Sequence, residues 1–229
     1  MALLAPFRQF FGWRRTALSP RYTPFSAASR RDLTYPSFLV DATRHLERVP
    51  TGPRLNPFRR FHTFSASLKA PGTPEDFYHL AERLLTGQVH DVAGAPLITR
   101  EGCVTPHGPG VRLPRVLGNG RAQIKPMDVV YVTFWGLWAP CLVLAGGVEK
   151  NGDANTDHML ARLTYGTLPG HAECGEETFE LKYHNGQLTA WVGAFSRAGR
   201  WYTMLGGPIA RVVQRWMARR YAEALLGRR

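Results

Sequence analysis

The chain has 229 residues, of which 44% are hydrophobic, so it is long enough and apolar enough to bury a core of its own. Its 29 lysines and arginines outnumber its 17 acidic residues, and the resulting formal net charge of +12 attracts anionic partners without choosing among them. Three cysteines, Cys103, Cys141 and Cys174, lie far apart with no CxxC pair, which argues against a disulfide framework or a zinc ribbon and favours a reducing, cytoplasmic setting.

Residues 1–31 differ from the rest of the chain, because they hold six arginines and no acidic residue. Leucine, phenylalanine and tryptophan recur among the arginines, and Pro6 interrupts any continuous apolar run, so a secretory signal is poorly supported. We expect a basic arm that is disordered or lies at the periphery of the fold. Two alternatives stay open: contact of residues 1–31 with an anionic membrane surface, and organelle targeting if the organism is eukaryotic.

Residues 32–229 are expected to form a single α+β domain. It begins with an extended segment over residues 32–57, where proline and arginine are frequent. The alternating pattern of residues 59–69 predicts a strand. A helix follows, with Thr73 as its N-cap and Gly87 after its last turn.

Further strand patterns recur through the second half of the chain. They cover residues 111–117, 121–134, 140–149, 158–167, 176–184 and 187–197. Residues 129–148 contain no charge over a length that could span a membrane, but glycine and proline interrupt the run and its residue types are those of buried strands. We therefore interpret this stretch as two core strands rather than as a transmembrane helix.

The last two strands are predicted to form a hairpin. Asn185 and Gly186 are the residue types that a tight two-residue turn requires, because both central positions need a positive φ. Counting outward from this turn sets Phe179 opposite Val192 and leaves one apolar face.

A long C-terminal helix is predicted from Pro208 to the residue before Gly227. Its apolar residues fall on one predicted face: Ile209, Val212, Val213, Trp216, Met217, Tyr221, Ala224 and Leu225. Three arginines recur at steps of four on the opposite face, at Arg211, Arg215 and Arg219. We interpret them as a solvated surface and expect no specific nucleic-acid binding, because no zinc-finger, RNP-type or Walker pattern accompanies them.

The order of these elements resembles the helix-grip (START or Bet v 1-like) fold. The expected domain has one strand, short helices, further antiparallel strands and a long final helix, with about six to seven strands in the sheet. The resemblance implies that the sheet wraps around the C-terminal helix and leaves an apolar cavity between them.

A second resemblance rests on the segment YGTLPGHAECGEETF at residues 165–179. Further matching segments are DLTYP at 32–36, VHDVAG at 89–94, PCLVL at 140–144, AFSR at 194–197, GPIARVVQ at 207–214 and RRYAEAL at 219–225. Together they are similar to an uncharacterised protein family known only as a domain of unknown function, over about residues 32–226. The family motif usually has proline at the position of Ala172 and serine at that of Cys174, so the resemblance implies that the family does not depend on a cysteine nucleophile. No established reaction comes with it.

Six residues in and around this segment are candidate ligand-binding residues: Tyr165, His171, Glu176, Glu177, Arg197 and Tyr221. The hairpin register brings Glu177 within a few residues of Arg197, and such a pair would be either a structural ion pair or a group that orients a ligand. His90, outside the segment, is interpreted as a satisfied or exposed histidine.

A metal site is not expected in this segment. His171, Glu173, Glu176 and Glu177 have the order H-x-E-x-x-E-E, but Glu176 and Glu177 point to opposite faces if a strand starts there. We therefore predict no metal, no cofactor and no catalytic residue.

Three functional hypotheses remain. The preferred one is a binding module that holds a small apolar or lipid-like ligand between the sheet and the helix at residues 208–226. The second is an enzyme that uses His171 with Glu173, Glu176 or Glu177 in acid-base or metal chemistry. The third is a peripheral membrane protein anchored through residues 1–31.

Overall fold

The computed structural model describes residues 28–51, 60–99, 123–134, 137–150, 158–199 and 207–228. In this part of the chain the strands are β1 (His62–Pro71), β2 (Leu97–Thr99), β3 (Val129–Phe134), β4 (Leu137–Lys150), β5 (His158–Thr167), β6 (Glu173–His184) and β7 (Gln187–Ala198). The α-helices are α2 (Pro74–Leu85), α3 (Gln88–Ala93) and α5 (Gly207–Leu225). Three short 3-10 helices precede β1: η4 (Arg30–Asp32), η5 (Ser37–Leu39) and η6 (Ala42–Arg48).

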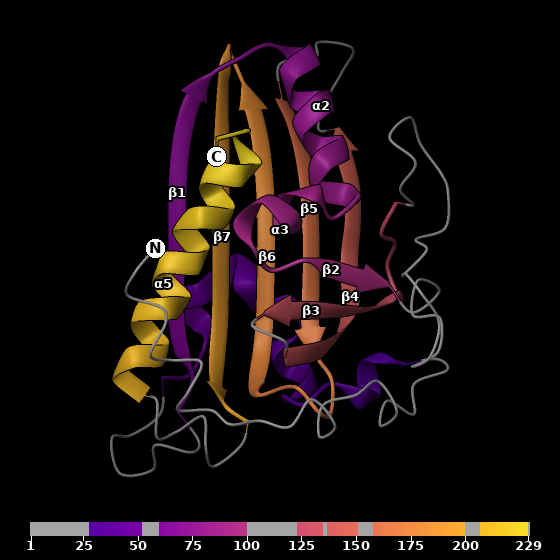
Figure 1. The fold of residues 1–229 in the computed structure, drawn as a ribbon, viewed down its shortest axis with the longest axis vertical. Helices are drawn as coiled ribbons and strands as arrows, with labels where there is room; N and C mark the ends of the chain where they lie inside the picture. The colour runs from indigo at the N-terminus through magenta and orange to yellow at the C-terminus, as the bar shows by residue number, and fades with distance from the viewer. Residues whose placement is uncertain are drawn as a thin grey trace.

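The seven described strands form one antiparallel sheet in the order β1-β7-β6-β5-β4-β3-β2. Neighbours in the chain are neighbours in the sheet from β2 to β7, and β1 pairs with the last strand. Helices α2, α3 and α5 all lie against the same face of this sheet, as Figure 1 shows. We call it the inner face. The architecture confirms the predicted α+β class and the helix-grip arrangement.

The β6–β7 hairpin forms as predicted. Asn185 and Gly186 both have positive φ, at 46° and 76°. Phe179 pairs with Val192, and Leu181 and Tyr183 share the inner face with it. The two-residue turn therefore determines which side chains of β6 face the helices.

Helix α2 also begins and ends at the predicted residues. The Thr73 hydroxyl accepts a hydrogen bond from the backbone N–H of Asp76, whose carboxylate in turn accepts from the backbone N–H of Thr73 at 2.9 Å. This reciprocal capping box satisfies donors that a helix start otherwise leaves unpaired. Gly87 follows the helix with a φ of 77°, so the chain can turn directly into α3.

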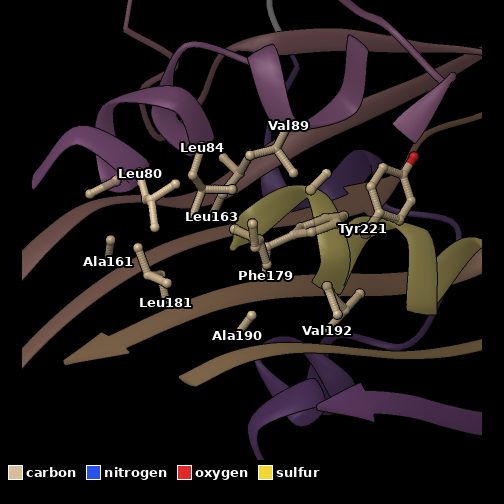
Figure 2. Close-up of a cluster of buried hydrophobic side chains, with 14 of the residues drawn as sticks. Leu80, Leu84, Val89, Ala161, Leu163, Phe179, Leu181, Ala190, Val192 and Tyr221 are labelled. Atoms are coloured by element: carbon tan, nitrogen blue, oxygen red, sulfur yellow. The ribbon is translucent and has the colours of Figure 1, made fainter. Parts of the chain in front are cut away.

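The main hydrophobic core lies between the inner face and the three helices. Figure 2 shows Leu84 and Val89, from α2 and α3, pointing toward Leu163 and Phe179 on the central strands. These side chains are fully buried. Strands β3 and β4 occupy the described part of the uncharged stretch 129–148, which confirms the prediction of two core strands. No described helix is long and apolar enough to cross a membrane.

The segment 28–51 covers the outer face of the sheet. Tyr35 and Phe61 both meet the ring of Phe195 edge-on, at centroid distances of 5.4 and 5.3 Å. The segment lies over the domain as expected, but it is not extended, because three short 3-10 helices fold it back on itself. Most of the basic arm and the predicted strand at 111–117 lie outside the described residues.

Helix α5 differs from the prediction in its orientation. Val212 and Trp216 were expected in the buried stripe, yet their exposed fractions are 66% and 44%. The small residues Ala218 and Ala222 are buried instead, at 1% and 0%. The apolar stripe of the sequence is wider than the contact with the sheet, and the helix rests on the side where alanines allow close approach.

Replacing Phe179 by alanine should destabilise the domain by about 3–5 kcal/mol, because it removes a fully buried aromatic ring and leaves a cavity. Val148→Ala is the control, because Val148 is 40% exposed, and it should change stability by less than about 1 kcal/mol. Urea unfolding followed by circular dichroism measures both. Equal effects of the two substitutions would contradict the assignment of the core.

Candidate functional site

A chain of polar side chains is buried within the apolar core on the inner face. Tyr165 of β5 lies directly opposite Glu177 of β6, and its hydroxyl donates a hydrogen bond to Glu177 Oε2 at 2.9 Å. His90 Nε2 of α3 is 3.3 Å from the same hydroxyl. Tyr221 of α5 packs beside this group, with its ring centroid 5.0 Å from that of His90. We call His90, Tyr165, Glu177 and Tyr221 the inner cluster.

Aromatic rings enclose the histidine of this cluster. The His90 ring lies 4.7 Å from Phe179 and 5.0 Å from Tyr221, measured between ring centroids. The exposed fraction of His90 is 0%, and its Nδ1 has no hydrogen-bond partner in the described part of the chain. A buried polar atom without a partner costs about 1–3 kcal/mol, so this nitrogen is an unusual feature of an otherwise apolar interior.

Burial sets the protonation of the inner cluster. It lowers the pKa of His90 to about 3, so the ring is neutral near neutral pH. It raises the pKa of Glu177 to about 7, with a further contribution from the charge of Glu173 and an opposing one from the hydrogen bond of Tyr165. When Tyr165 donates to Glu177, the neutral His90 ring can donate from Nε2, which leaves Nδ1 as a hydrogen-bond acceptor.

A second group of polar side chains lies beside the inner cluster, where α5 crosses the ends of β6 and β7. Gln214 Nε2 donates to Glu173 Oε1 at 2.6 Å and to Ser196 Oγ at 3.1 Å. Burial raises the pKa of Glu173, and its hydrogen bonds oppose that effect. Glu173, Glu177 and Gln214 are less deeply buried than His90 and Tyr165.

Glu176 lies on the opposite face and does not belong to the inner cluster. Its carboxylate accepts hydrogen bonds from the Tyr35 hydroxyl at 2.8 Å and from the backbone N–H of Asp41 at 2.9 Å. It also accepts from the backbone N–H and the hydroxyl of Thr43, at 3.1 and 2.6 Å. With four donors satisfied in a buried site, Glu176 is the anchor that holds the segment 28–51 on the outer face.

His171 and Arg197 lie in a third place, a surface hollow of about 340 Å³ near the ends of β5, β6 and β7. His171 Nδ1 accepts a hydrogen bond from the backbone N–H of Glu173 at 2.9 Å, which stabilises the turn before β6. Burial lowers the pKa of His171 to about 4 and keeps the ring neutral. This histidine therefore has a structural partner and does not reach the inner cluster.

The expected pair between Glu177 and Arg197 is not formed. Glu177 is opposite Ala194, and a residue three positions further along β7 points to the other face of the sheet. Arg197 Nε instead donates to the Cys174 thiol at 3.3 Å, and its guanidinium lies 5.0 Å from the Phe61 ring centroid. The alternation that separates these residues also separates Glu176 from Glu177.

The acid-base or metal constellation considered for the YGTLPGHAECGEE segment is not assembled. His171, Glu173, Glu176 and Glu177 are divided between the turn and the two faces of the sheet, as their separate hydrogen-bond partners show. Within the described ranges, no three side chains of histidine, cysteine, aspartate or glutamate converge as metal ligands.

Of the six candidate residues, the structure brings three together: Tyr165, Glu177 and Tyr221. His90, predicted to be satisfied or exposed, is neither: it is fully buried and its Nδ1 has no hydrogen-bond partner in the described part of the chain. Its local pattern resembles that of any short amphipathic turn. His90 lies in the matching segment VHDVAG, but only the tertiary packing of α3 brings its ring to Tyr165, so the segment alone does not reveal this contact.

Replacing Glu177 by glutamine should change the pH dependence of stability. The folded-state pKa of Glu177 is raised from 4.5 to about 7, so its contribution to stability is fully present below pH 4.5 and is lost as the pH rises through about 7. Glutamine stays neutral. The variant should therefore gain on the order of 2–3 kcal/mol relative to the wild type between about pH 4.5 and pH 8.

Urea unfolding at several pH values measures this difference. Glu47→Gln is the matched control, because the Glu47 side chain is 71% exposed. Parallel pH profiles for wild type and Glu177→Gln would show that Glu177 is not perturbed.

Removing the Glu176 carboxylate should release the segment that it anchors. Glu176→Ala leaves the Tyr35 and Thr43 hydroxyls without their acceptor and should cost about 3 kcal/mol or more. Hydrogen exchange should accelerate across residues 34–43 while the β6–β7 hairpin stays protected. Glu47→Ala is the control, and unchanged exchange at residues 34–43 would refute the anchoring role.

Comparison with solved structures finds similar folds at low sequence identity. A hypothetical protein from Helicobacter pylori is 11% identical, with 72% of this chain and 86% of that chain covered and a TM-score of 0.49. A START superfamily protein from Mycobacterium smegmatis is 12% identical, with 72% and 95% covered and a TM-score of 0.41. Norcoclaurine synthase from Thalictrum flavum is 10% identical, with 73% and 85% covered and a TM-score of 0.36. These likenesses are remote, and no ligand or reaction of this chain follows from them.

Comparison of the chain with family models shows its family membership. No curated protein matches the chain. One family model, Domain of unknown function (DUF1990), matches residues 41–224. This range includes the YGTLPGHAECGEE segment, most of the sheet and nearly all of α5. The chain belongs to the DUF1990 family, as the resemblance of its motifs implied.

Proposed function

We propose that the domain binds a small, mainly apolar molecule between the inner face of the sheet and α5, and that a polar group of this molecule contacts the inner cluster. The observation that carries the proposal is the unpartnered Nδ1 of His90, fully buried beside the Tyr165–Glu177 hydrogen bond. A bound polar group would supply the missing partner.

The energetics of the interior support this proposal. Burying His90, Tyr165, Glu177 and Tyr221 requires desolvation of four polar groups in a core that is otherwise apolar. Burial raises the pKa of Glu177, as expected where a carboxylate has few partners that stabilise its charge. Such an arrangement costs stability in the empty domain and is typical of residues that contact a ligand or take part in proton transfer.

Packing narrows the place where the molecule can lie. Beneath α2 the core is filled, because Phe77, Leu84 and Leu163 have exposed fractions of 0%. Near the start of α5, Glu177 and Gln214 are partly exposed on the inner face. The proposed molecule enters from this end and is smaller than one that would occupy the full length of the sheet.

The polar lining indicates the chemistry of the ligand's polar group. His90 Nδ1 and the carboxylates of Glu173 and Glu177 are acceptors, and Gln214 is already engaged as a donor. A ligand group that donates hydrogen bonds, such as a hydroxyl, an amide N–H or an amine, complements this lining.

A second candidate function, acid-base catalysis on the bound molecule, is favoured by the pKa of Glu177. A value of about 7 suits a group that exchanges a proton near neutral pH. In this form of the enzyme hypothesis, Glu177 exchanges the proton beside Tyr165. His171 and Glu176 have no role in it, because they lie outside the inner cluster.

Native mass spectrometry of protein purified from its own host tests the proposal. We expect an added mass that is lost on denaturation, and its organic extract identifies the ligand class. Glu177→Gln and Tyr165→Phe should each lower the bound fraction severalfold, because each removes a polar contact worth about 1 kcal/mol or more. Glu47→Gln should retain the wild-type occupancy.

A chain without added mass in wild-type preparations would contradict ligand binding. The same experiment separates the two candidate functions. A carrier retains one compound at different occupancies in wild type and variants. An enzyme inactivated at Glu177 retains its substrate, so that the compound bound to Glu177→Gln differs from the one bound to the wild type.

A further inference from the structure

The outer surface of α5 carries an unexpected combination of exposed side chains. Val212 and Trp216 are exposed at 66% and 44%, although their sequence pattern predicts burial. Arg211, Arg215 and Arg219 are also exposed. We call these five residues the outer face of α5.

Helix geometry places the two kinds of residue in adjacent rows. Positions four apart lie one above the other on a helix, so Val212 and Trp216 form one row and the three arginines form the next. The guanidinium carbon of Arg220 lies 4.9 Å from the Trp216 ring centroid, which adds a further cation at the edge of the apolar row.

The apolar part of this surface continues onto α3. Val92, which is 36% exposed, lines a shallow hollow of about 240 Å³ together with Trp216 and Arg220. Figure 1 shows α3 beside α5 on the same side of the sheet. The surface is therefore broader than a single helix row.

Charge on this surface is almost entirely positive. Residues 207–222 contain no acid. Glu223 is paired with Arg219 at 3.2 Å, whereas Arg211 and Arg215 have no ion-pair partner in the described part of the chain. The whole chain carries a formal net charge of +12, so the electrostatic field around the outer face of α5 attracts anionic surfaces.

We propose that the outer face of α5 docks on an anionic membrane surface. Tryptophan and valine next to a row of arginines is the pattern of helices that lie in the lipid headgroup region, where the apolar side chains enter the interface and the cations bind lipid phosphates. A nucleic acid would satisfy the arginines but would leave Val92 and Val212 exposed to water, so the apolar row favours the bilayer.

This docking is independent of the ligand proposed for the inner face. It also differs from the contact expected for residues 1–31, because it depends on side chains of the folded domain. Loss of binding in variants of α5, with residues 1–31 intact, separates the two.

Flotation of the full chain with liposomes tests the docking. We expect binding to vesicles that contain phosphatidylglycerol or phosphatidylserine and little binding to neutral phosphatidylcholine vesicles. R211Q/R215Q should weaken the partition coefficient roughly 30-fold, the effect of two arginines near an anionic surface. The control R44Q/R48Q removes two exposed arginines from η6, which packs on the other face of the sheet, and should change binding by less than about twofold.

The apolar row has its own test. Trp216→Ser should weaken binding at least severalfold, whereas Phe38→Ser, at a residue that is 74% exposed in η5, should leave it unchanged. Brominated lipids should quench less tryptophan fluorescence in Trp216→Phe than in the wild type. Circular dichroism and thermal unfolding verify that the variants are folded.

Three outcomes would overturn the proposal. They are absence of wild-type flotation with anionic vesicles, equal losses in R211Q/R215Q and R44Q/R48Q, and binding of duplex DNA or RNA with no binding to vesicles. Weaker binding of R211Q/R215Q and of Trp216→Ser, with unchanged binding of R44Q/R48Q and Phe38→Ser, would establish it.

Discussion

The alternation of side chains along β6 is the constraint on which the rest of the structure depends. Glu176 and Glu177 are neighbours in the chain, but a strand directs them to opposite faces of the sheet. On the outer face of the sheet, the Glu176 carboxylate accepts four hydrogen bonds from the segment 28–51 and holds it in place. Inward, Glu177 joins the inner cluster beneath the helices. A register shift by one residue would exchange the two environments, so the turn at Asn185 and Gly186 indirectly positions both.

The two glutamates also show how surroundings decide the role of the same residue type. Burial raises the pKa of each, but Glu176 has its acceptor oxygens satisfied by four donors. Glu177 has the Tyr165 hydroxyl and a nearby acid, which opposes its ionisation. The first arrangement stabilises a fixed contact. The second leaves a carboxyl whose charge is easily changed by a partner, which is why the inner face, and not the motif as a whole, is the candidate site.

Much of the fold could be predicted from the sequence, because its strongest signals are local. The hairpin turn, the capping box at Thr73 and the strand patterns each depend on residues within a few positions of one another. The candidate site could be predicted only in part. Its four polar residues all lie in segments that match the family, but the sequence does not show which of them come together. His90 joins the other three through tertiary packing, and the partner of Arg197 depends on strand parity across two strands. Such contacts lie beyond local periodicity.

The orientation of α5 links the inner cluster to the surface that we propose as a docking site. A wide apolar stripe predicts burial of Val212 and Trp216, but Ala218 and Ala222 let the backbone approach the sheet, and the helix rests on that side. Tyr221 then reaches the inner cluster while Trp216 points to solvent, and Gln214 ties the helix to Glu173 and Ser196. The close approach at these two alanines thus directs Tyr221 toward the inner cluster and leaves Trp216 on the surface that we propose to dock on a membrane.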